Sequence, residues 1–343
     1  MHAVRPRGGA PAPPTAVVLG GRGFLGRNVC TALRAGGWEV TAAGRTGAPG
    51  PPGCRALRLD PLREGPETIV AALAAIAPAL VVNTAGALWD AAGEDFERGN
   101  TALVAALLAA VERLPAPVRL VHLGSLYEYG TQAADRPLRE DLTEHPVGPY
   151  ARSKLAGTRL VTSAAASGRV DAVVLRIATA IGPWTPRQSL FGGLARQLAA
   201  APDRVELPPL SGERDIVDSR DVADAVLAAA VAAAVPPVVN VGRGVSVPVA
   251  DAVDALLRIS GAESRGTAAP VVRTGGARER RDGGVGGQPL DITLARTVLG
   301  WSPVRDLPEA LGALWNGIRH CADGSDPIAS QRSITANGDT SHA

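Results

Sequence analysis

Lysine is almost absent from this sequence. Of its 35 basic residues, 34 are arginine, and Lys154 is the only lysine. Tyrosine is nearly as scarce, with only Tyr127, Tyr129 and Tyr150 in 343 residues. The chain uses arginine wherever a positive charge suffices, which argues against Lys154 being one interchangeable surface cation among many. We infer that position 154 requires an amine.

Cysteine and histidine are too few and too scattered to form a metal site or a disulfide framework. The three cysteines, Cys30, Cys54 and Cys321, show no ligand spacing, and the five histidines form no pair at helical spacing. We therefore predict no metal site. An odd, sparse set of cysteines is typical of reduced thiols, so we expect a cytoplasmic protein.

Long apolar runs are also missing. The most apolar stretch, residues 223–239, is interrupted by Asp224 and by Pro236-Pro237, so it is too broken to span a bilayer. Residues 1–14 lack the apolar segment of a secretory signal. The net charge of +2 argues against nucleic acid as the main partner. We expect a soluble protein that binds neither nucleic acid nor membrane.

Against this background the pair Tyr150 and Lys154 stands out. Four residues of separation place both side chains one turn apart on one helix face. A phenol titrates near pH ~10, and a neighbouring ammonium should lower that pKa. Such a phenol can give a proton to a carbonyl oxygen as hydride arrives at the carbon. An amphipathic helix with an exposed tyrosine and lysine gives the same spacing, so the pair needs support from elsewhere.

A glycine-rich turn near the N-terminus gives that support. An apolar strand at residues 16–19 runs into Gly-Gly-Arg-Gly-Phe-Leu-Gly and then a helix at residues 27–35. This context is the one that a dinucleotide fingerprint requires, whereas three glycines alone could be only a turn. Gly20 permits the tight turn, Gly23 lets a pyrophosphate approach the backbone, and Gly26 lets helix and strand pack closely. The same turn contributes Arg22, Phe24 and Leu25 to the predicted cofactor site.

The residue after the second strand bears on the choice of cofactor. NAD-binding folds usually place an acid there, on the adenosine ribose. This chain instead has Gly44-Arg45-Thr46 after the strand at residues 39–43. Arg45 and Arg22 could hold a 2′-phosphate by charge-assisted hydrogen bonds, so we favour NADP(H) over NAD(H). The alternative is that Arg45 is one more surface arginine.

Short Val/Leu-rich strands alternate with helices over the first 180 residues. This pattern predicts an α/β fold with a Rossmann-type, doubly wound parallel sheet. Ligands bind such sheets at the carboxyl ends of the strands. Ser125 follows the strand at residues 118–122, where its hydroxyl could bond a substrate carbonyl. The other residues that we place at strand ends beside the cofactor are Leu59, Asp60, Thr84, Ala85, Gly86 and Ile177.

With these motifs in order, the chain resembles the extended short-chain dehydrogenase/reductase superfamily, in its nucleotide-sugar epimerase and dehydratase branch. The resemblance covers residues 16–319. It is carried by residues 23–26, by Asn100, by Gly124-Ser125 with Tyr129-Gly130, by Tyr150 and Lys154, by Leu175-Arg176 with Gly182-Pro183, by residues 214–217 with 221–223, and by residues 299–303.

The resemblance implies a role for each site residue. Ser125 bonds the substrate carbonyl, Tyr150 is the acid/base, and Lys154 tunes Tyr150 and holds the nicotinamide ribose. Asn100 supports the lysine. The implied substrate contacts are Ser125, Leu126, Tyr127, Thr179 and Arg214. It also implies a homodimer through the helices near Asn100 and Tyr150.

The resemblance further implies how the chain is divided. An NADP-binding Rossmann domain is expected at residues 15–183 and 216–244. A smaller, mixed α/β substrate-binding lobe is expected at residues 184–215 and 245–320. Residues 1–14 and 321–343 are predicted to be a disordered leader and tail.

Departures from the family pattern narrow the function. Dehydratases of this branch carry an Asp-Glu pair where this chain has Leu126 and Tyr127, which argues against dehydration. Arg45 suits a releasable NADPH, so a net reductase is favoured. The chain looks like the antibiotic-sugar 4-ketoreductases, which reduce a dTDP-4-keto-6-deoxyhexose at C4. The alternatives are a nucleotide-sugar epimerase with recycled NAD, a ketoreductase of a non-sugar small molecule, and a non-catalytic NADP sensor.

Overall fold

The computed structural model describes residues 12–87, 93–133, 136–201, 205–207, 209–261, 273–274 and 287–322. Most of the predicted leader and tail lies outside these ranges. Cys321 and Ala322 belong to the last helix, so the predicted tail begins two residues too early. None of the helices in the described ranges combines the length and apolarity needed to cross a membrane.

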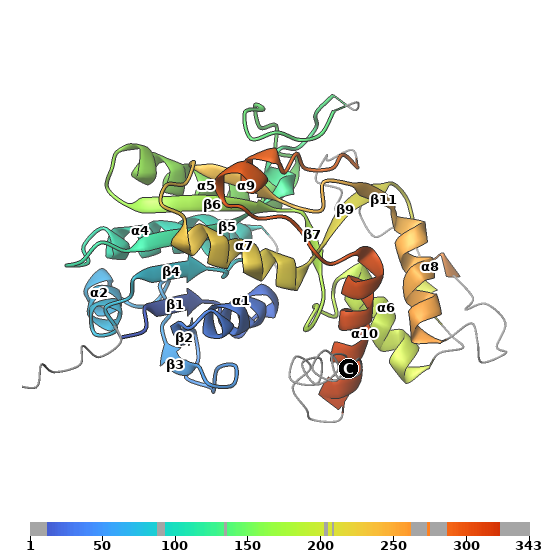
Figure 1. Cartoon of the computed structure of the whole chain (residues 1–343), viewed down its shortest axis with the longest axis horizontal. Coiled ribbons are helices and arrows are strands. Elements are labelled where there is room, and N and C mark those ends of the chain that lie inside the picture. The colour runs from blue at the N-terminus through green and yellow to red at the C-terminus, as the bar shows by residue number, and fades with distance from the viewer. Residues whose placement is uncertain are drawn as a thin grey trace, which may run out of the picture.

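A seven-stranded parallel sheet forms the centre of the molecule, as predicted (Figure 1). Its order is β10-β6-β5-β4-β1-β2-β3. The strands are β1 (Thr15–Leu19), β2 (Glu39–Gly44), β3 (Arg55–Arg58), β4 (Leu80–Asn83), β5 (Arg119–Ser125), β6 (Asp171–Ile177) and β10 (Val238–Val241). Because the chain runs outward from β1 in one direction and from β4 in the other, the strand order reverses between them. In sheets of this kind ligands bind at that point.

Helices cover both faces of this sheet because its strands are apolar on both sides. Val17 of β1 belongs to one buried cluster and Val18 to the other, as alternation along a strand requires. One face carries α1 (Phe24–Ala35), α7 (Ser219–Val231) and α9 (Thr293–Val298). The other carries α2 (Pro66–Ala74), α4 (Leu103–Val111) and α5 (Gly148–Ala166).

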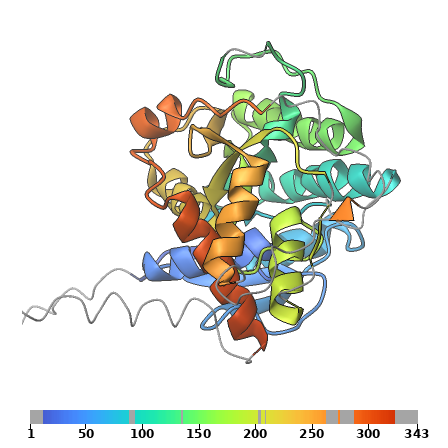
Figure 2. The same cartoon turned by 90° about the vertical axis from the view of Figure 1, so that its right-hand side faces the viewer.

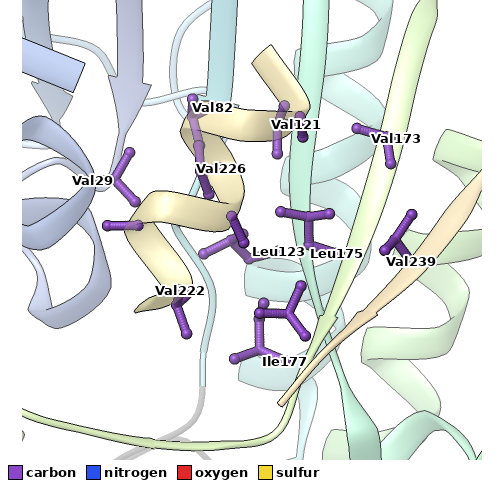
Figure 3. Close-up of a cluster of buried hydrophobic side chains, with 14 of the residues drawn as sticks. Val29, Val82, Val121, Leu123, Val173, Leu175, Ile177, Val222, Val226 and Val239 are labelled. Carbon is purple, nitrogen blue, oxygen red and sulfur yellow. The ribbon is translucent and has the colours of Figure 1, made fainter. Parts of the chain in front are cut away.

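Helix α7 fills the centre of its face (Figure 3). Its Val222 and Val226 lie in one buried cluster with Val82, Leu123 and Leu175 from three neighbouring strands. All five side chains are at most 5% exposed, so this contact is a dry core. Burying apolar surface stabilises the folded chain by about 25 cal/mol per Å². This contact therefore helps to fix the sheet whose strand ends carry the site.

A second lobe lies beside the carboxyl ends of the strands (Figure 2). Its small sheet has the order β11-β9-β7, with β9 parallel to β7 and antiparallel to β11. The strands are β7 (Thr179–Ile181), β9 (Glu213–Asp218) and β11 (Ser246–Pro248), and a separate ladder pairs β8 (Glu206–Leu207) with β12 (Arg273–Thr274). The helices are α6 (Leu190–Ala200), α8 (Val249–Ser260) and α10 (Leu307–Ala322). Their apolar faces form a third cluster that includes Phe191, Leu256 and Leu311.

Two buried aspartates attach later segments to the fold. Asp221 accepts hydrogen bonds from the Arg305 backbone (3.1 Å) and, through its carbonyl oxygen, from the Trp301 indole (3.0 Å). Asp215 accepts three backbone N–H bonds, from Arg243, Gly244 and Leu290. Buried carboxylates need such donors, since an unpaired one is costly. The two aspartates therefore fix the segments that follow β10 and α9.

Candidate active site

The glycine turn has the close contacts that a dinucleotide site needs. Gly20 has a φ of +78°, which side chains rarely adopt. A Cβ on Gly26 would lie 2.1 Å from the Gly20 carbonyl oxygen, so α1 can approach the turn only because position 26 is glycine. Phe24 and Leu25 begin α1 directly after Gly23. The first N–H groups of α1 are thereby placed at the turn, where a diphosphate binds favourably.

The opposite wall of the crevice is the turn after β4. A Cβ on Gly20 would lie 2.8 Å from the Ala85 backbone nitrogen and 2.9 Å from the Thr84 hydroxyl. Thr84 in turn donates to the Leu19 carbonyl oxygen (2.8 Å). Gly86 lies against the Asn100 side chain. The structure thus brings the two predicted turns together at the reversal of strand order.

Arg22 and Arg45 lie where the adenosine end of a dinucleotide is expected. Arg22 reaches across Gly44 and donates to the Thr46 hydroxyl (2.6 Å). Arg45 lies between these two residues and is exposed. At the end of the next strand, Leu59 donates to the Gly44 carbonyl oxygen (2.9 Å), and Asp60 accepts from the Leu62 backbone (3.2 Å). The end of β2 therefore offers two guanidinium groups and no carboxylate.

Ser125, Tyr150 and Lys154 meet at the carboxyl end of β5. Ser125 is the last residue of β5, and its side chain acts to lower the pKa of the Tyr150 phenol. Lys154 is buried on α5 and donates to the Leu123 carbonyl oxygen (2.5 Å). Ile177 pairs with Ser125 across β5 and β6. The predicted triad thus comes together from one strand and one helix.

The protonation states differ from our expectation that Lys154 lowers the pKa of Tyr150. Burial raises the pKa of Tyr150 well above its ordinary value of 10, and the charge of Glu128 and the neighbouring Tyr127 act in the same direction. Burial also lowers the pKa of Lys154, although Glu128 opposes this. The reason is that desolvation penalises the charged form of both groups. Tyr150 is therefore held as a neutral phenol, the form that can donate a proton.

Asn100 lies in a one-turn π-helical segment, Arg98–Ala102, between α3 (Glu94–Glu97) and α4. Such segments often mark functional sites. Its amide exchanges two hydrogen bonds with the Ala87 backbone (2.8 and 2.9 Å) and donates to the Ser153 hydroxyl (3.0 Å). Asn100 therefore connects the loop after β4 to α5 through Ser153, the residue before Lys154.

Three of the remaining predicted substrate residues lie near this centre. Leu126 and Tyr127 start the short 3₁₀ segment η2 (Leu126–Glu128), and Leu126 is buried. The Tyr127 ring is 6.1 Å from the Tyr150 ring, in an edge-to-face arrangement. Thr179 begins β7, two residues after Ile177. Arg214 lies instead on β9, where it donates to the Glu213 carbonyl oxygen (2.6 Å), and its substrate role stays a prediction.

The sequence-based prediction missed Glu128 and assigned Arg176 only to a motif. Both side chains are buried, and the Arg176 Nε donates to the Glu128 carboxylate (2.9 Å). Arg176 also donates to Glu144 (2.6 Å) and lies 4.5 Å over the Tyr129 ring. An arginine inside the apolar strand β6 was the available signal, because a buried guanidinium needs an acidic partner.

Within the described residues, no group of three or more His, Cys, Asp or Glu side chains is arranged to hold a metal ion.

Comparison with known proteins is consistent with this geometry. The model of the NAD dependent epimerase/dehydratase family matches residues 16–242. The dTDP-6-deoxy-L-talose 4-dehydrogenase (NAD(P)(+)) of Kitasatospora kifunensis is 36% identical over 323 residues, covering 93% of this chain and 98% of the relative. The GDP-6-deoxy-D-mannose reductase of Pseudomonas aeruginosa is 28% identical over 196 residues, covering 56% and 62%. The solved structure of MoeE5 with UDP-glucose and NAD is 28% identical, has a TM-score of 0.74, and covers 90% of this chain and 99% of that one.

Proposed function

The chain belongs to the NAD-dependent epimerase/dehydratase family, and from this premise we propose that it is an NADPH-dependent 4-ketoreductase of a dTDP-4-keto-6-deoxyhexose. The coarser statement, that it is an NAD(P)-dependent oxidoreductase that modifies nucleotide sugars, follows from the family and from its relatives. The relative from Kitasatospora is named for oxidation at C4 of a dTDP-sugar. Oxidation of that alcohol and reduction of the 4-ketone are one reaction in its two directions.

The observation that carries the proposal is the meeting of Ser125 and Tyr150 at the carboxyl end of β5. A ketone oxygen placed between their hydroxyls would accept a hydrogen bond from Ser125 and a proton from Tyr150. A nicotinamide supplies the hydride when it is bound. Burial keeps the proton on Tyr150 until a charged oxygen develops beside it. Lys154, held by Leu123, places an amine on the same helix face as Tyr150.

The residues present fit a dinucleotide. A Cβ at position 26 would fill the space between Gly20 and Gly26, so glycine at this position is what lets α1 begin close to the turn. The exposed Arg45 and the Arg22 guanidinium beside Thr46 support NADP(H) over NAD(H), because bidentate guanidinium groups suit a 2′-phosphate. Both would hold the cofactor at its adenosine end.

The lack of carboxylates at positions 126 and 127 argues for reduction over dehydration. Leu126 and Tyr127 stand where the dehydratases carry their carboxylates. The one carboxylate of this segment, Glu128, accepts hydrogen bonds from the Ser125 backbone N–H and from the buried Arg176. It is therefore engaged by a structural cation. This leaves Tyr150 as the acid/base group of the site.

We also propose that the protein is a cytoplasmic homodimer. A groove of about 200 Å³ between α4 and α5 has an apolar part, formed by Ala105, Leu108, Ala109, Leu160 and Ala164, and a polar part, formed by Glu112, Ser163 and Arg169. Its apolar part could pack against the same surface of a second copy. The described cysteines, Cys30 and Cys54, are free thiols, which supports a reducing compartment.

The test is incubation of the full chain with NADPH and a panel of dTDP-4-keto-6-deoxyhexoses. We expect loss of the NADPH absorbance with equal formation of the 4-hydroxy sugar. Tyr150→Phe should lower kcat by about 10²-fold to 10⁴-fold and should still bind NADPH. No oxidation of NADPH across the panel contradicts the proposal. Sugar conversion without net NADPH loss would indicate an epimerase, and turnover of non-sugar ketones alone would indicate the other reductase.

A further inference from the structure

Glu128 is a fully buried acid one hydrogen bond from Ser125. One carboxylate oxygen accepts from the Ser125 backbone N–H (2.8 Å), and the other accepts from Arg176 (2.9 Å). The Ser125 hydroxyl accepts from the Tyr127 backbone N–H (3.3 Å), so Ser125 and Glu128 close a capping box around η2. This arrangement fixes the backbone from which the Ser125 hydroxyl projects.

The negative charge of Glu128 is held in place. A buried carboxylate is costly unless it is paired, and Arg176 is equally buried and donates to it. Arg176 is in turn held by Glu144 and by the face of the Tyr129 ring. Because each partner is fixed by other contacts, the carboxylate cannot turn away from Ser125. Gly124 contributes as well, since a Cβ there would lie 2.8 Å from a Glu128 oxygen.

We propose that Glu128 is a positioning residue of the catalytic centre, which fixes Ser125 and places a carboxylate beside Tyr150 and Lys154. Its importance for catalysis rests on the proposed reductase function. The placement itself rests only on the contacts of Glu128 with Ser125 and Arg176.

The sign of the effect follows from Coulomb's law. Glu128 stabilises the Lys154 ammonium and so raises the pKa of Lys154 against the lowering by burial. It destabilises the Tyr150 phenolate and so raises the pKa of Tyr150. Both effects keep protons on the groups that would serve a ketone reduction.

The other ionisable groups on the elements around Lys154 set the background for this effect. His122 lies on β5, and burial together with the Lys154 charge lowers its pKa, so it stays neutral. Arg176 lies on β6 and is paired with Glu128. Arg98 on the π segment is exposed. Among the described residues, Glu128 is therefore the buried acid whose charge acts on Lys154.

The single lysine makes this proposal directly measurable. In the full chain labelled with carbon-13 at the lysine Cε, Lys154 gives the one lysine signal, whose shift against pH reports its titration. We expect Glu128→Gln to move the midpoint to lower pH than in the wild type, because the neutral amide no longer stabilises the ammonium. Neither substrate nor cofactor is needed.

Glu144→Gln is the matched control. Glu144 also bonds Arg176 but does not contact Ser125, so this variant disturbs the same buried guanidinium without removing the charge next to the site. We expect its Lys154 midpoint to match the wild type. A Glu128→Gln midpoint equal to the wild type, or an equal shift in both variants, overturns the proposal. If Glu128→Gln does not fold, Glu128→Gln with Arg176→Gln is compared with Arg176→Gln alone, so that only position 128 differs, and equal Lys154 midpoints in these two variants overturn the proposal as well.

Turnover gives a second readout. With a keto-sugar that the wild type reduces, Glu128→Gln should lower kcat by roughly 10-fold to 100-fold through a misplaced Ser125, with KM for NADPH little changed. Its pH profile should move in the same direction as the Lys154 midpoint, which a purely structural defect would not produce. An unchanged kcat and pH profile contradict the proposal. A wild type that reduces no keto-sugar defeats the reductase function instead and leaves the lysine titration readable.

Discussion

Gly26→Ala tests whether the glycine turn and α1 are as closely packed as the structure shows. The new Cβ would lie 2.1 Å from the Gly20 carbonyl oxygen and 2.8 Å from the Gly21 Cα, whereas ordinary contacts begin at 3.4 Å. The turn and the helix must therefore separate by more than 1 Å. Both partners are backbone, so no side chain can rotate to relieve the contact.

The size of the effect follows from two opposing contributions. Overpacking of this kind costs about 3 kcal/mol, at the upper end of its usual range, because only backbone can move. Alanine in place of glycine inside a helix returns about 1 kcal/mol. We expect a net loss of about 2 kcal/mol in the free energy of unfolding. The displaced turn should also weaken NADPH binding by about tenfold, which corresponds to about 1.4 kcal/mol.

Gly312→Ala is the matched control, because Gly312 lies inside α10 and a Cβ there would meet no atom within 4 Å. It should gain about 1 kcal/mol from helix propensity alone. Urea denaturation followed by tryptophan fluorescence compares the three proteins, and NADPH titration compares their affinities. A Gly26→Ala protein as stable as the wild type, or as tightly bound to NADPH, refutes the close packing on which the site depends.

Three further predictions test the neighbourhood of the site. Arg45→Ala should lower the preference for NADPH over NADH in kcat/KM by about tenfold or more, and an unchanged ratio would place the 2′-phosphate elsewhere. Burial acts to raise the pKa of Glu144, but the hydrogen bond from Arg176 keeps that pKa below 4.5. The ion pair therefore contributes its full stability above pH 4.5 and loses this contribution as the pH falls through the lowered pKa. Glu144→Gln should therefore cost about 2 kcal/mol at neutral pH and less in acid, as urea unfolding against pH will show; a loss independent of pH contradicts this assignment. Cys54 should react with iodoacetamide before Cys30. The reason is that the contact between the two thiols lowers the pKa of Cys54, whereas the same contact and burial raise the pKa of Cys30. Peptide mass mapping that finds Cys30 modified first would refute this order.

Much of the cofactor side could be predicted because its signals are local. Gly20, Gly23 and Gly26 lie close together between a strand and a helix, and in the structure Gly20 packs against Thr84 and Ala85. The parallel sheet followed from the alternation of short apolar strands with helices. The smaller mixed α/β lobe was predicted as well, but its strands β7, β9 and β11 were not located as one sheet, because they are too short to show a period.

The sequence alone determined which residues meet at the site. The four-residue spacing of Tyr150 and Lys154 and the position of Ser125 after an apolar strand are covalent facts, and one helix facing one strand end brings them together. Only the tertiary structure decided their charge states. Glu128 and Arg176 are 48 positions apart in the chain, and their pairing depends on β5 lying beside β6. Burial is a property of the folded interior, so the direction in which the pKa of Tyr150 moves could not be predicted from the spacing of a phenol and an amine.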